Sequence, residues 1–331
     1  MNTVLVVGGA GYIGSVTANC LVEKGYDVTV LDNLDRGHIT AVPRGANFVQ
    51  GDIRDRDSLV SALSALRPDC VVHFAALAYV GESFERTPEY LDINIGGTAS
   101  LLAAMQQCDV GNIVFSSSCT VYGVPLTLPI SEDEPVKPPI SPYGFTKQMC
   151  EQMLEWSRSA SGLSFGALRY FNAAGAWKQF GEDHTPETHL IPLVLDAATG
   201  RRDKIVVFGD DYATPDGTCI RDYIHVRDLA TAHASACEKL TGSKAGTSFT
   251  VNLGCGHGHS VLDIIKGVQR VTGLDVPYEI SDRRPGDPPE LVAANGRAHQ
   301  LLGWTPTHSS LDEIIESAYA WRQKHPAGYP G

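Results

Sequence analysis

The sequence predicts an α/β protein with a doubly wound parallel sheet and a smaller, loop-rich second domain. Three observations predict it. Short apolar runs alternate with helical stretches over the first 170 residues, a glycine-rich turn follows the first apolar run, and prolines and glycines cluster in the second half. Strands that are apolar on both faces are typical of parallel sheets that helices cover on both sides.

The elements of the first half follow from this alternation, because apolar runs of four to eight residues favour strands and longer periodic segments favour helices. The hydroxyls of Thr87 and Ser141 each precede a proline, which predicts a helix cap followed by proline at the first helical position. The expected strands are Thr3–Val7, Asp27–Leu31, Asn47–Val49, Cys70–Phe74, Asn112–Phe115 and Ser164–Leu168, and the expected helices are Tyr12–Lys24, Asp57–Leu66, Pro88–Gln107 and Pro142–Ala160.

The alternation ends near Asn172. Beyond it, prolines and glycines gather in Lys178–Pro192, Gly209–Gly217 and Arg284–Pro289. We therefore expect a first domain of residues 1–172 and a second of residues 173–331. Some segments of the second half, Thr250–Leu253 among them, are expected to return to the main sheet.

Composition narrows the class of protein. The chain has 331 residues, 43% of them hydrophobic and 19% charged, and a net charge of −12. An acidic protein repels phosphate-rich polymers, which disfavours nucleic acid or a membrane surface as the main partner. No charged leader or long apolar run opens the sequence, so a cytoplasmic protein is expected.

Cysteine and histidine patterns give no sign of a disulfide framework or a metal centre. The eight cysteines are scattered and form no C-x-x-C pair, so reduced thiols are expected. The only close histidine pair, His257 and His259, lies in a glycine-rich turn without carboxylate or thiol neighbours at ligand spacing. We expect no bound metal.

The glycine-rich turn Gly8-Gly9-Ala10-Gly11-Tyr12-Ile13-Gly14 is a variant of the dinucleotide fingerprint. Gly8 permits the tight turn, Gly11 lets backbone amides approach a pyrophosphate, and Gly14 lets helix and strand pack closely. Asp32, at the end of the second strand, is placed to bind a ribose 2′-hydroxyl and to repel a 2′-phosphate. The pattern predicts a Rossmann domain that binds NAD rather than NADP.

Two further positions bear on the cofactor. Arg36 follows Asp32 by four residues and would favour a 2′-phosphate, but we interpret it as a solvated arginine. Asp52 and Ile53 follow the third strand and fit an edge that cradles adenine, whereas the alternative for Asp52 is a helix cap.

Reactive side chains follow the fifth strand and begin the last long helix. Tyr143 and Lys147 are four residues apart, which places them on one helical face. A nearby ammonium and a positive nicotinamide ring would favour the tyrosine phenolate, whose free pKa is near 10. The run Ser116–Gly123 lies at the carboxyl edge of the sheet, where a serine can bridge a substrate hydroxyl and the tyrosine. Together these features favour a hydride-transfer enzyme.

At this point the sequence resembles the extended short-chain dehydrogenase/reductases, and from end to end it is similar to their sugar-nucleotide epimerase branch. The stretch Gly217–Val226 is especially specific to that branch. The other similar segments are Gly8–Gly14, Leu31–Leu34, Gly51–Arg54, His73–Ala76, Val80–Ser83, Asn94, Ser116–Gly123, Ser141–Lys147, Leu168–Asn172, Val207–Tyr212, Arg284–Asp287 and Leu302–Trp304.

The resemblance implies interconversion of UDP-glucose and UDP-galactose by transient oxidation at sugar carbon 4, with tightly bound NAD. It implies a catalytic set of Ser118, Tyr143 and Lys147. The implied cofactor residues are Gly8, Gly11, Tyr12, Ile13, Gly14, Asp32, Asn33, Asp52, Ile53, Phe74, Ala75, Ala76, Asn94, Tyr143, Lys147 and Tyr170. The implied substrate residues are Ser118, Thr120, Tyr143, Asn172, His189, Leu190, Phe208, Arg221, Arg284, Asp287 and Leu291.

In this interpretation Arg221 and Arg284 bind the diphosphate, Asp287 a ribose, and Phe208 the uracil pocket. The alternative for each arginine is a surface ion pair. Relatives are commonly homodimers through two helices of the nucleotide domain, so a homodimer is expected.

Three departures from the family pattern leave questions open. Ala78 stands where a lysine is frequent, so one cofactor contact is absent or supplied elsewhere. His189 replaces a common asparagine, and Leu291 holds the position whose bulk is thought to decide whether an N-acetyl group fits. UDP-N-acetylhexose and UDP-uronate pairs therefore remain alternative substrates.

Two rival functions are weaker. A dehydratase or decarboxylase of the same superfamily needs an acid or base where this chain has Cys119 and Thr120. An NAD-binding sensor without catalysis would be expected to lack one of Ser118, Tyr143 or Lys147.

Overall fold

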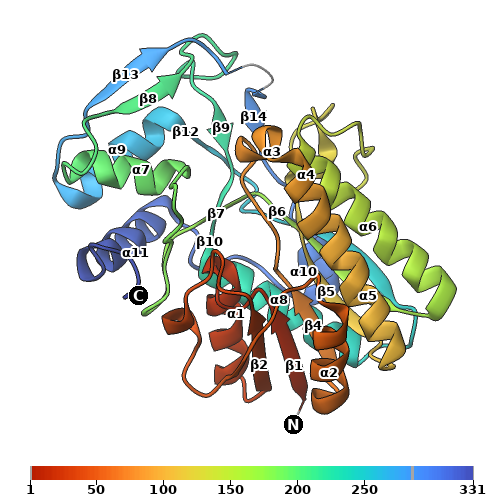
Figure 1. The fold of residues 1–331 in the computed structure, drawn as a ribbon. Coiled ribbons are helices and arrows are strands. Elements are labelled where there is room, and N and C mark those ends of the chain that lie inside the picture. The colour runs from red at the N-terminus through yellow and green to blue at the C-terminus, as the bar shows by residue number, and fades with distance from the viewer. Residues whose placement is uncertain (1, 285–286, 331) are drawn as a thin grey trace.

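The computed structural model describes residues 2–284 and 287–330, and it contains the doubly wound sheet that the sequence predicts (Figure 1). Pro285 and Gly286, which belong to the motif Arg284–Asp287, lie outside the described residues. Seven parallel strands have the order β11-β6-β5-β4-β1-β2-β3. Their bounds are β1 Thr3–Val7, β2 Asp27–Asp32, β3 Asn47–Gln50, β4 Cys70–His73, β5 Asn112–Ser118, β6 Ser164–Tyr170 and β11 Ser248–Leu253.

The six strands expected in the first half are all present; four of them, β2, β3, β5 and β6, are longer than expected, and β4 is one residue shorter. β5 continues through Ser118, because Ser116–Ser118 stay in register with Leu168–Tyr170 of β6. The three serines are buried despite their polarity. This extension brings the serine cluster to the carboxyl edge of the sheet. The seventh strand, β11, contains the returning segment Thr250–Leu253 and pairs with β6.

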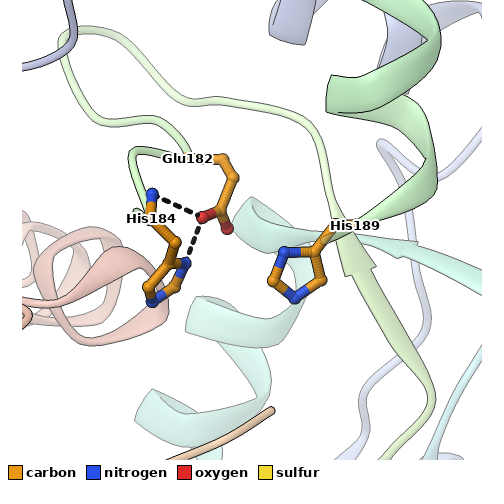
Figure 2. Close-up of side chains that lie close together, drawn as sticks. All are labelled: Glu182, His184 and His189. Atoms are coloured by element: carbon orange, nitrogen blue, oxygen red, sulfur yellow. Dashed lines mark hydrogen bonds and ion pairs between the residues drawn. The ribbon is translucent and has the colours of Figure 1, made fainter. Parts of the chain in front are cut away.

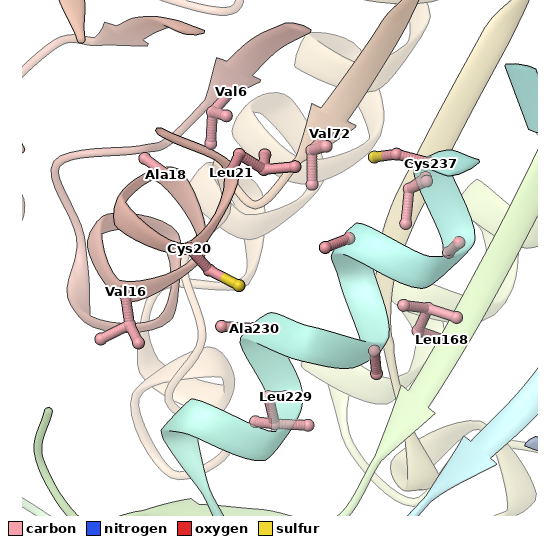
Figure 3. Close-up of a cluster of buried hydrophobic side chains, with 14 of the residues drawn as sticks. Val6, Val16, Ala18, Cys20, Leu21, Val72, Leu168, Leu229, Ala230 and Cys237 are labelled. Carbon is pink, nitrogen blue, oxygen red and sulfur yellow. The ribbon is translucent and has the colours of Figure 1, made fainter. Parts of the chain in front are cut away.

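Helices cover both faces of the sheet. On one face, α1 (Tyr12–Glu23) packs beside α8 (Val226–Thr241), and Figure 3 shows Cys20 and Ala230 where the two helices face each other. On the other face lie α2 (Arg56–Leu66), α5 (Gly97–Gln107) and α6 (Pro142–Ser161). The position of α8 beside α1, on the first of these faces, was not expected from the sequence.

The segment Pro88–Gln107, expected as one helix, is interrupted. It comprises α4 (Thr87–Tyr90), a π-helical turn over Leu91–Gly96, and α5, and it follows the short helix α3 (Glu82–Glu85). The expected cap at Thr87 is wrong, because the Thr87 hydroxyl donates back to the carbonyl of Ser83 at 2.7 Å. The cap at Ser141 is confirmed by the 3.1 Å bond from the Gly144 amide to its hydroxyl.

The rest of the second half forms a smaller region with its own core, drawn at the upper left of Figure 1. Helices α7 (Leu190–Ala198), α9 (Val261–Thr272) and α11 (Leu311–Lys324) pack there against the strand pair β8 (Ile205–Phe208) and β13 (Tyr278–Ser281). The remaining elements are β7 Asn172–Ala174, β9 Ile220–Arg221, β10 Tyr223–His225, β12 His259–Ser260, β14 Glu290–Leu291 and α10 Gly296–Leu302.

The cysteines and the helices bear on two general expectations. The eight cysteines, all within the described residues, are free thiols. Among the described helices, none combines the length and apolar character required to span a bilayer.

Candidate active site

A cavity of about 530 Å³ lies at the carboxyl edge of the large sheet and is lined by both regions of the chain. The glycine turn after β1, the acid at the end of β2 and the serines at the end of β5 all reach it. Its size is within the range of about 300–1,000 Å³ that ligand sites usually have. Open parallel sheets bind ligands at this edge, where successive strand ends converge.

The glycine turn has the shape that a dinucleotide requires. A Cβ on Gly14 would lie 2.2 Å from the Gly8 carbonyl oxygen, so helix α1 could not pack as closely with any other residue there. Gly8 has a φ of +80°, which favours glycine. A Cβ on Gly11, by contrast, would meet only one atom, at 3.5 Å, and Gly11 lines the cavity. The turn therefore leaves room for a pyrophosphate beside the start of α1.

Asp32 is buried at the end of β2 and is held by two backbone amides. Its carboxylate accepts from Ala10 at 3.0 Å and from Leu34 at 2.9 Å. Burial raises the pKa of Asp32, and these amides act against that rise. A carboxylate has about four acceptor positions, so Asp32 retains acceptor capacity toward the cavity that it lines.

The interpretation of Arg36 as a solvated arginine is wrong. Its side chain is only 26% exposed, donates to the Glu82 carboxylate at 2.8 Å, and lies over the ring of Tyr79. The ion pair occupies the guanidinium that could have attracted a 2′-phosphate. The preference for NAD over NADP is thereby strengthened.

Asp52 and Ile53 both line the cavity, as the adenine interpretation requires. The helix-cap alternative for Asp52 is wrong, because Asp55 caps α2 by accepting from the Ser58 amide. Asp52 instead forms an ion pair with Arg54 at 2.8 Å and accepts from Asn33 at 3.2 Å. These contacts fix the wall of the cavity beyond β3.

All the cofactor residues inferred from the sequence line this cavity except Asn94. The side chain of Asn94 is buried, and both amide protons are used by the Leu77 carbonyl and the Thr146 hydroxyl, each at 3.0 Å. Its oxygen accepts from the Leu77 amide at 2.8 Å. A contact of Asn94 with the nucleotide stays a prediction that would require one of these bonds to be exchanged.

The catalytic residues inferred from the sequence, Ser118, Tyr143 and Lys147, line the same cavity. Ser118 ends β5, and its hydroxyl accepts from the Thr120 amide and hydroxyl at 3.2 and 3.0 Å. Tyr143 and Lys147 lie in the first turns of α6, and the lysine nitrogen is 5.8 Å from the centre of the tyrosine ring. The Ser141 cap sets where α6 begins and therefore where both side chains lie.

The protein alone does not produce the lowered tyrosine pKa that the sequence suggested. Burial raises the pKa of Tyr143 well above its usual value, the neighbouring Tyr170 raises it further, and a hydrogen bond from Ser118 opposes the rise. Burial also lowers the pKa of Lys147 to about 8. The Lys147 ammonium donates to the Ser116 carbonyl at 2.8 Å. A phenolate at Tyr143 therefore depends on a further positive charge in the cavity.

The expected substrate residues fall into two groups. Ser118, Thr120, Tyr143, Asn172, His189, Leu190 and Arg284 line the cavity, whereas Phe208, Arg221, Asp287 and Leu291 do not. The residues of the second group lie directly beside those that line the cavity. The Arg284 guanidinium lies 3.9 Å from the centre of the Phe208 ring, and Arg221 pairs with Leu291 across β9 and β14.

Arg221 and Asp287 contact each other directly. Their guanidinium and carboxylate form an ion pair, and the Arg221 side chain is only 13% exposed. Leu291 packs on the cluster of Cys119, Tyr122 and Phe171 beside the cavity. Arg221 thus forms the ion pair that was considered as its alternative role. This ion pair is half-buried and adjoins the site, so it does not lie on the open surface.

Sequence reasoning missed a polar cluster on the α7 side of the cavity. Glu182, His184 and His189 converge there. From the sequence, only His257 and His259 were considered as a possible metal site, and His189 was expected only as a substrate residue. Burial alone would lower the pKa of His189, but the carboxylates of Glu182 and Glu187 outweigh it and raise that pKa to about 9. The acids and histidines concentrated within residues 182–189 were the available signal.

Residues 4–254 match the NAD dependent epimerase/dehydratase family. The chain belongs to this family. It is 49% identical over 328 residues to the UDP-glucose 4-epimerase of Halalkalibacterium halodurans, an alignment that covers 98% of this chain and 97% of that protein. The similarity therefore extends over both regions of the fold.

Solved structures agree with this placement. The UDP-glucose 4-epimerase of Brucella ovis, crystallised in complex with NAD, is 51% identical with a TM-score of 0.94, covering 97% of this chain and 98% of that one. The enzyme of Bifidobacterium longum, in complex with NAD⁺ and UDP, is 39% identical with a TM-score of 0.93, covering 99% and 100%. The doubly wound fold and the dependence on NAD are those of the family.

Proposed function

We propose that this chain interconverts UDP-glucose and UDP-galactose by inverting sugar carbon 4 with tightly bound NAD. The observation that carries the proposal is the single cavity, in which the glycine turn, Asp32, Ser118 and Tyr143 meet. Full-length similarity to UDP-glucose 4-epimerases supports the same reaction. The glycine turn and Asp32 would hold NAD, which would accept the hydride from sugar carbon 4 and, once reduced, would give it back to the opposite face of the 4-keto sugar.

Tyr143 is proposed as the base that takes the proton of the sugar 4-hydroxyl and later returns it. Ser118 bridges the substrate hydroxyl and the phenol, and Lys147 holds the cofactor ribose and adds positive charge. The buried phenol resists ionisation in the protein alone. Oxidised nicotinamide, which is positive, supplies the opposing field, so Tyr143 ionises most readily when the oxidised cofactor is in place.

The substrate must be held unequally, firmly at UDP and loosely at the hexose that turns. Arg284 and Arg221 suit a diphosphate, because a guanidinium is always charged and binds it through two parallel bonds. Phe208, against which Arg284 stacks, is proposed to support uracil. Asp287 would then exchange its bond with Arg221 for a ribose hydroxyl.

Elimination of water or carbon dioxide is disfavoured by the residues after β5. Burial raises the pKa of Cys119 to about 12, so its thiol does not ionise near neutral pH. Thr120 carries no acid or base, and its hydroxyl is engaged with Ser118. The same positions would need a carboxylate in a dehydratase or decarboxylase.

Product analysis tests the proposal. Purified protein is incubated with UDP-galactose and, separately, with UDP-N-acetylgalactosamine, and the products are separated by chromatography. Formation of UDP-glucose, with transient reduced-nicotinamide absorbance and no added NAD, supports the proposal. No conversion of UDP-galactose by NAD-loaded protein refutes it. Leu291 packs against Cys119 and Phe171. Conversion of UDP-N-acetylgalactosamine would show that this arrangement leaves space for the N-acetyl group.

We also propose a homodimer in the cytoplasm. Trp156 on α6 is 75% exposed and Phe84 on α3 is 61% exposed, and burial of these apolar side chains in a subunit contact would be favourable. Light scattering on the wild type and on Trp156→Glu tests the dimer. A wild-type monomer would refute it, whereas a dimer that Trp156→Glu dissociates would support it.

A further inference from the structure

Glu182, His184 and His189 lie together on the wall of the cavity, and one ligand atom from each lies within 4.8 Å of the others. The two imidazole ring centres are 5.7 Å apart. Figure 2 shows the carboxylate of Glu182 between the two rings, with one oxygen bonded to His184. The three side chains thus point toward a common position.

The second carboxylate oxygen of Glu182 is an unsatisfied buried atom. The side chain is 8% exposed, and Oε2 has no hydrogen-bond partner among the residues that the structure describes, although Oε1 bonds to His184. Leaving a buried carboxylate oxygen unpaired is unfavourable, because the oxygen has lost its bonds to water without gaining others. Oε2 of the adjacent Glu187 is also buried without a partner. Each of these two acids therefore has a spare acceptor atom that a bound cation would satisfy.

The surrounding bonds hold these side chains in place. His189 is the residue before the first turn of α7, and its Nδ1 lies 2.8 Å from the Glu187 carboxylate. The loop that carries Glu182 and His184 is anchored through Asp183, which accepts from the Tyr329 amide at 2.6 Å. Tyr79 packs against both imidazoles, with its ring centre 5.3 Å from that of His184 and 6.0 Å from that of His189. An orienting carboxylate behind a ligand histidine is typical of metal sites.

We propose that Glu182, His184 and His189 form a Zn²⁺ site whose open coordination position faces the cavity. Two imidazoles and one carboxylate are a ligand set of zinc sites that keep a fourth position for water or substrate. Harder ions such as Mg²⁺ prefer oxygen ligands alone. Glu187 is the residue that orients His189, and a bound ion satisfies the free oxygen of Glu182.

An ion at this position is expected to affect epimerisation, an expectation that rests on the proposed function. The same cavity contains Tyr143 and Asn172, where the hexose is proposed to turn. Through its open coordination position, the ion would bind sugar hydroxyls and restrict the turning of the hexose. Zn²⁺ is therefore expected to inhibit epimerisation reversibly, with EDTA restoring the rate.

Binding is tested on the NAD-loaded protein without any UDP-sugar, so that its outcome does not depend on epimerase activity. Protein treated with EDTA and desalted is titrated with ZnSO₄ in a calorimeter, and Co²⁺ is titrated in parallel with its visible spectrum recorded. The variants are His184→Asn with His189→Asn, and separately Glu187→Gln. The matched control is His257→Asn with His259→Asn, whose rings are 5.5 Å apart but do not belong to the described ligand cluster.

The expected result is one Zn²⁺ per wild-type or control chain, no binding to the double variant, and about 10- to 100-fold weaker binding to Glu187→Gln. The Co²⁺ spectrum should lack sulfur-to-cobalt charge transfer, which excludes the free thiols as ligands. A thermal melt verifies that the double variant folds. No binding to the wild type, or equal binding to the double variant, overturns the proposal.

Discussion

Lys147 lies one turn beyond Tyr143 on α6, with its ammonium nitrogen 5.8 Å from the tyrosine ring centre and 2.8 Å from the Ser116 carbonyl oxygen. The lysine therefore binds the strand end rather than the phenol. Both side chains are buried, and burial works against the charge of each. Their charge states depend on what else fills the cavity.

The first prediction concerns Tyr143. Tyr143→Phe should fold and retain NAD but lose about 10²- to 10⁴-fold in kcat, which is the usual contribution of a general base. Steady-state kinetics with UDP-galactose and the NAD content of the purified variant measure the two effects. A kcat near that of the wild type would remove Tyr143 from the mechanism.

The second prediction separates two glycines of one turn. Gly11→Ala should fold, since its Cβ meets only one atom at 3.5 Å, but it should bind NAD more weakly because the methyl group enters the cavity. Gly14→Ala should destabilise the protein itself, since its Cβ would lie 2.2 Å from the Gly8 carbonyl oxygen. Thermal melts and NAD content distinguish them. Equal melting temperatures for the two variants would contradict this account.

The third prediction assigns the diphosphate to Arg284. Arg284→Ala should weaken UDP binding about 10- to 100-fold, the loss expected when a charged hydrogen-bonding partner is removed. NAD content should not change. Arg283→Ala is the matched control, because the neighbouring guanidinium is paired with Asp211 instead. Calorimetry with UDP measures both, and unchanged affinity in Arg284→Ala would refute the assignment.

The fourth prediction concerns stability at low pH. Burial lowers the pKa of His233 from 6.5 to about 4, so the unfolded state binds more protons than the folded state between these values. The free energy of unfolding should therefore be highest above pH 6.5 and fall as the pH drops to 4, by on the order of 3 kcal/mol from this residue.

The variant His233→Phe tests this contribution. Phenylalanine keeps an aromatic ring beside Phe74, 4.6 Å away in the wild type, but cannot take up a proton. Urea unfolding of NAD-loaded protein at several pH values should give a slope smaller by about one proton in the variant. Identical slopes would show that His233 does not titrate in this way.

Much of the site was predictable because its residues stand at short, regular spacings. Gly8, Gly11 and Gly14 follow one another at intervals of three positions. Lys147 is four positions after Tyr143, and Asp32 ends an apolar strand. Such spacings fix which side chains share a helix face or a strand end, whatever the rest of the chain does. The cap at Ser141 is another local feature, and it was predicted correctly.

Other features depend on contacts between distant segments. Arg36 bonds to Glu82, 46 residues away, and the interpretation as a solvated side chain failed for that reason. Thr87 bonds back to Ser83 because α3 precedes it closely, whereas the sequence suggested a helix cap.

The sequence by itself determined the parallel sheet, the glycine turn and the pairing of Tyr143 with Lys147, because periodicity and backbone sterics act over a few residues. Only the tertiary structure decided that α8 returns to cover the sheet beside α1, that Arg221 meets Asp287, and that Glu182 lies between two histidines. These contacts are set by how loops close and how helices pack. Local spacing carries no information about either.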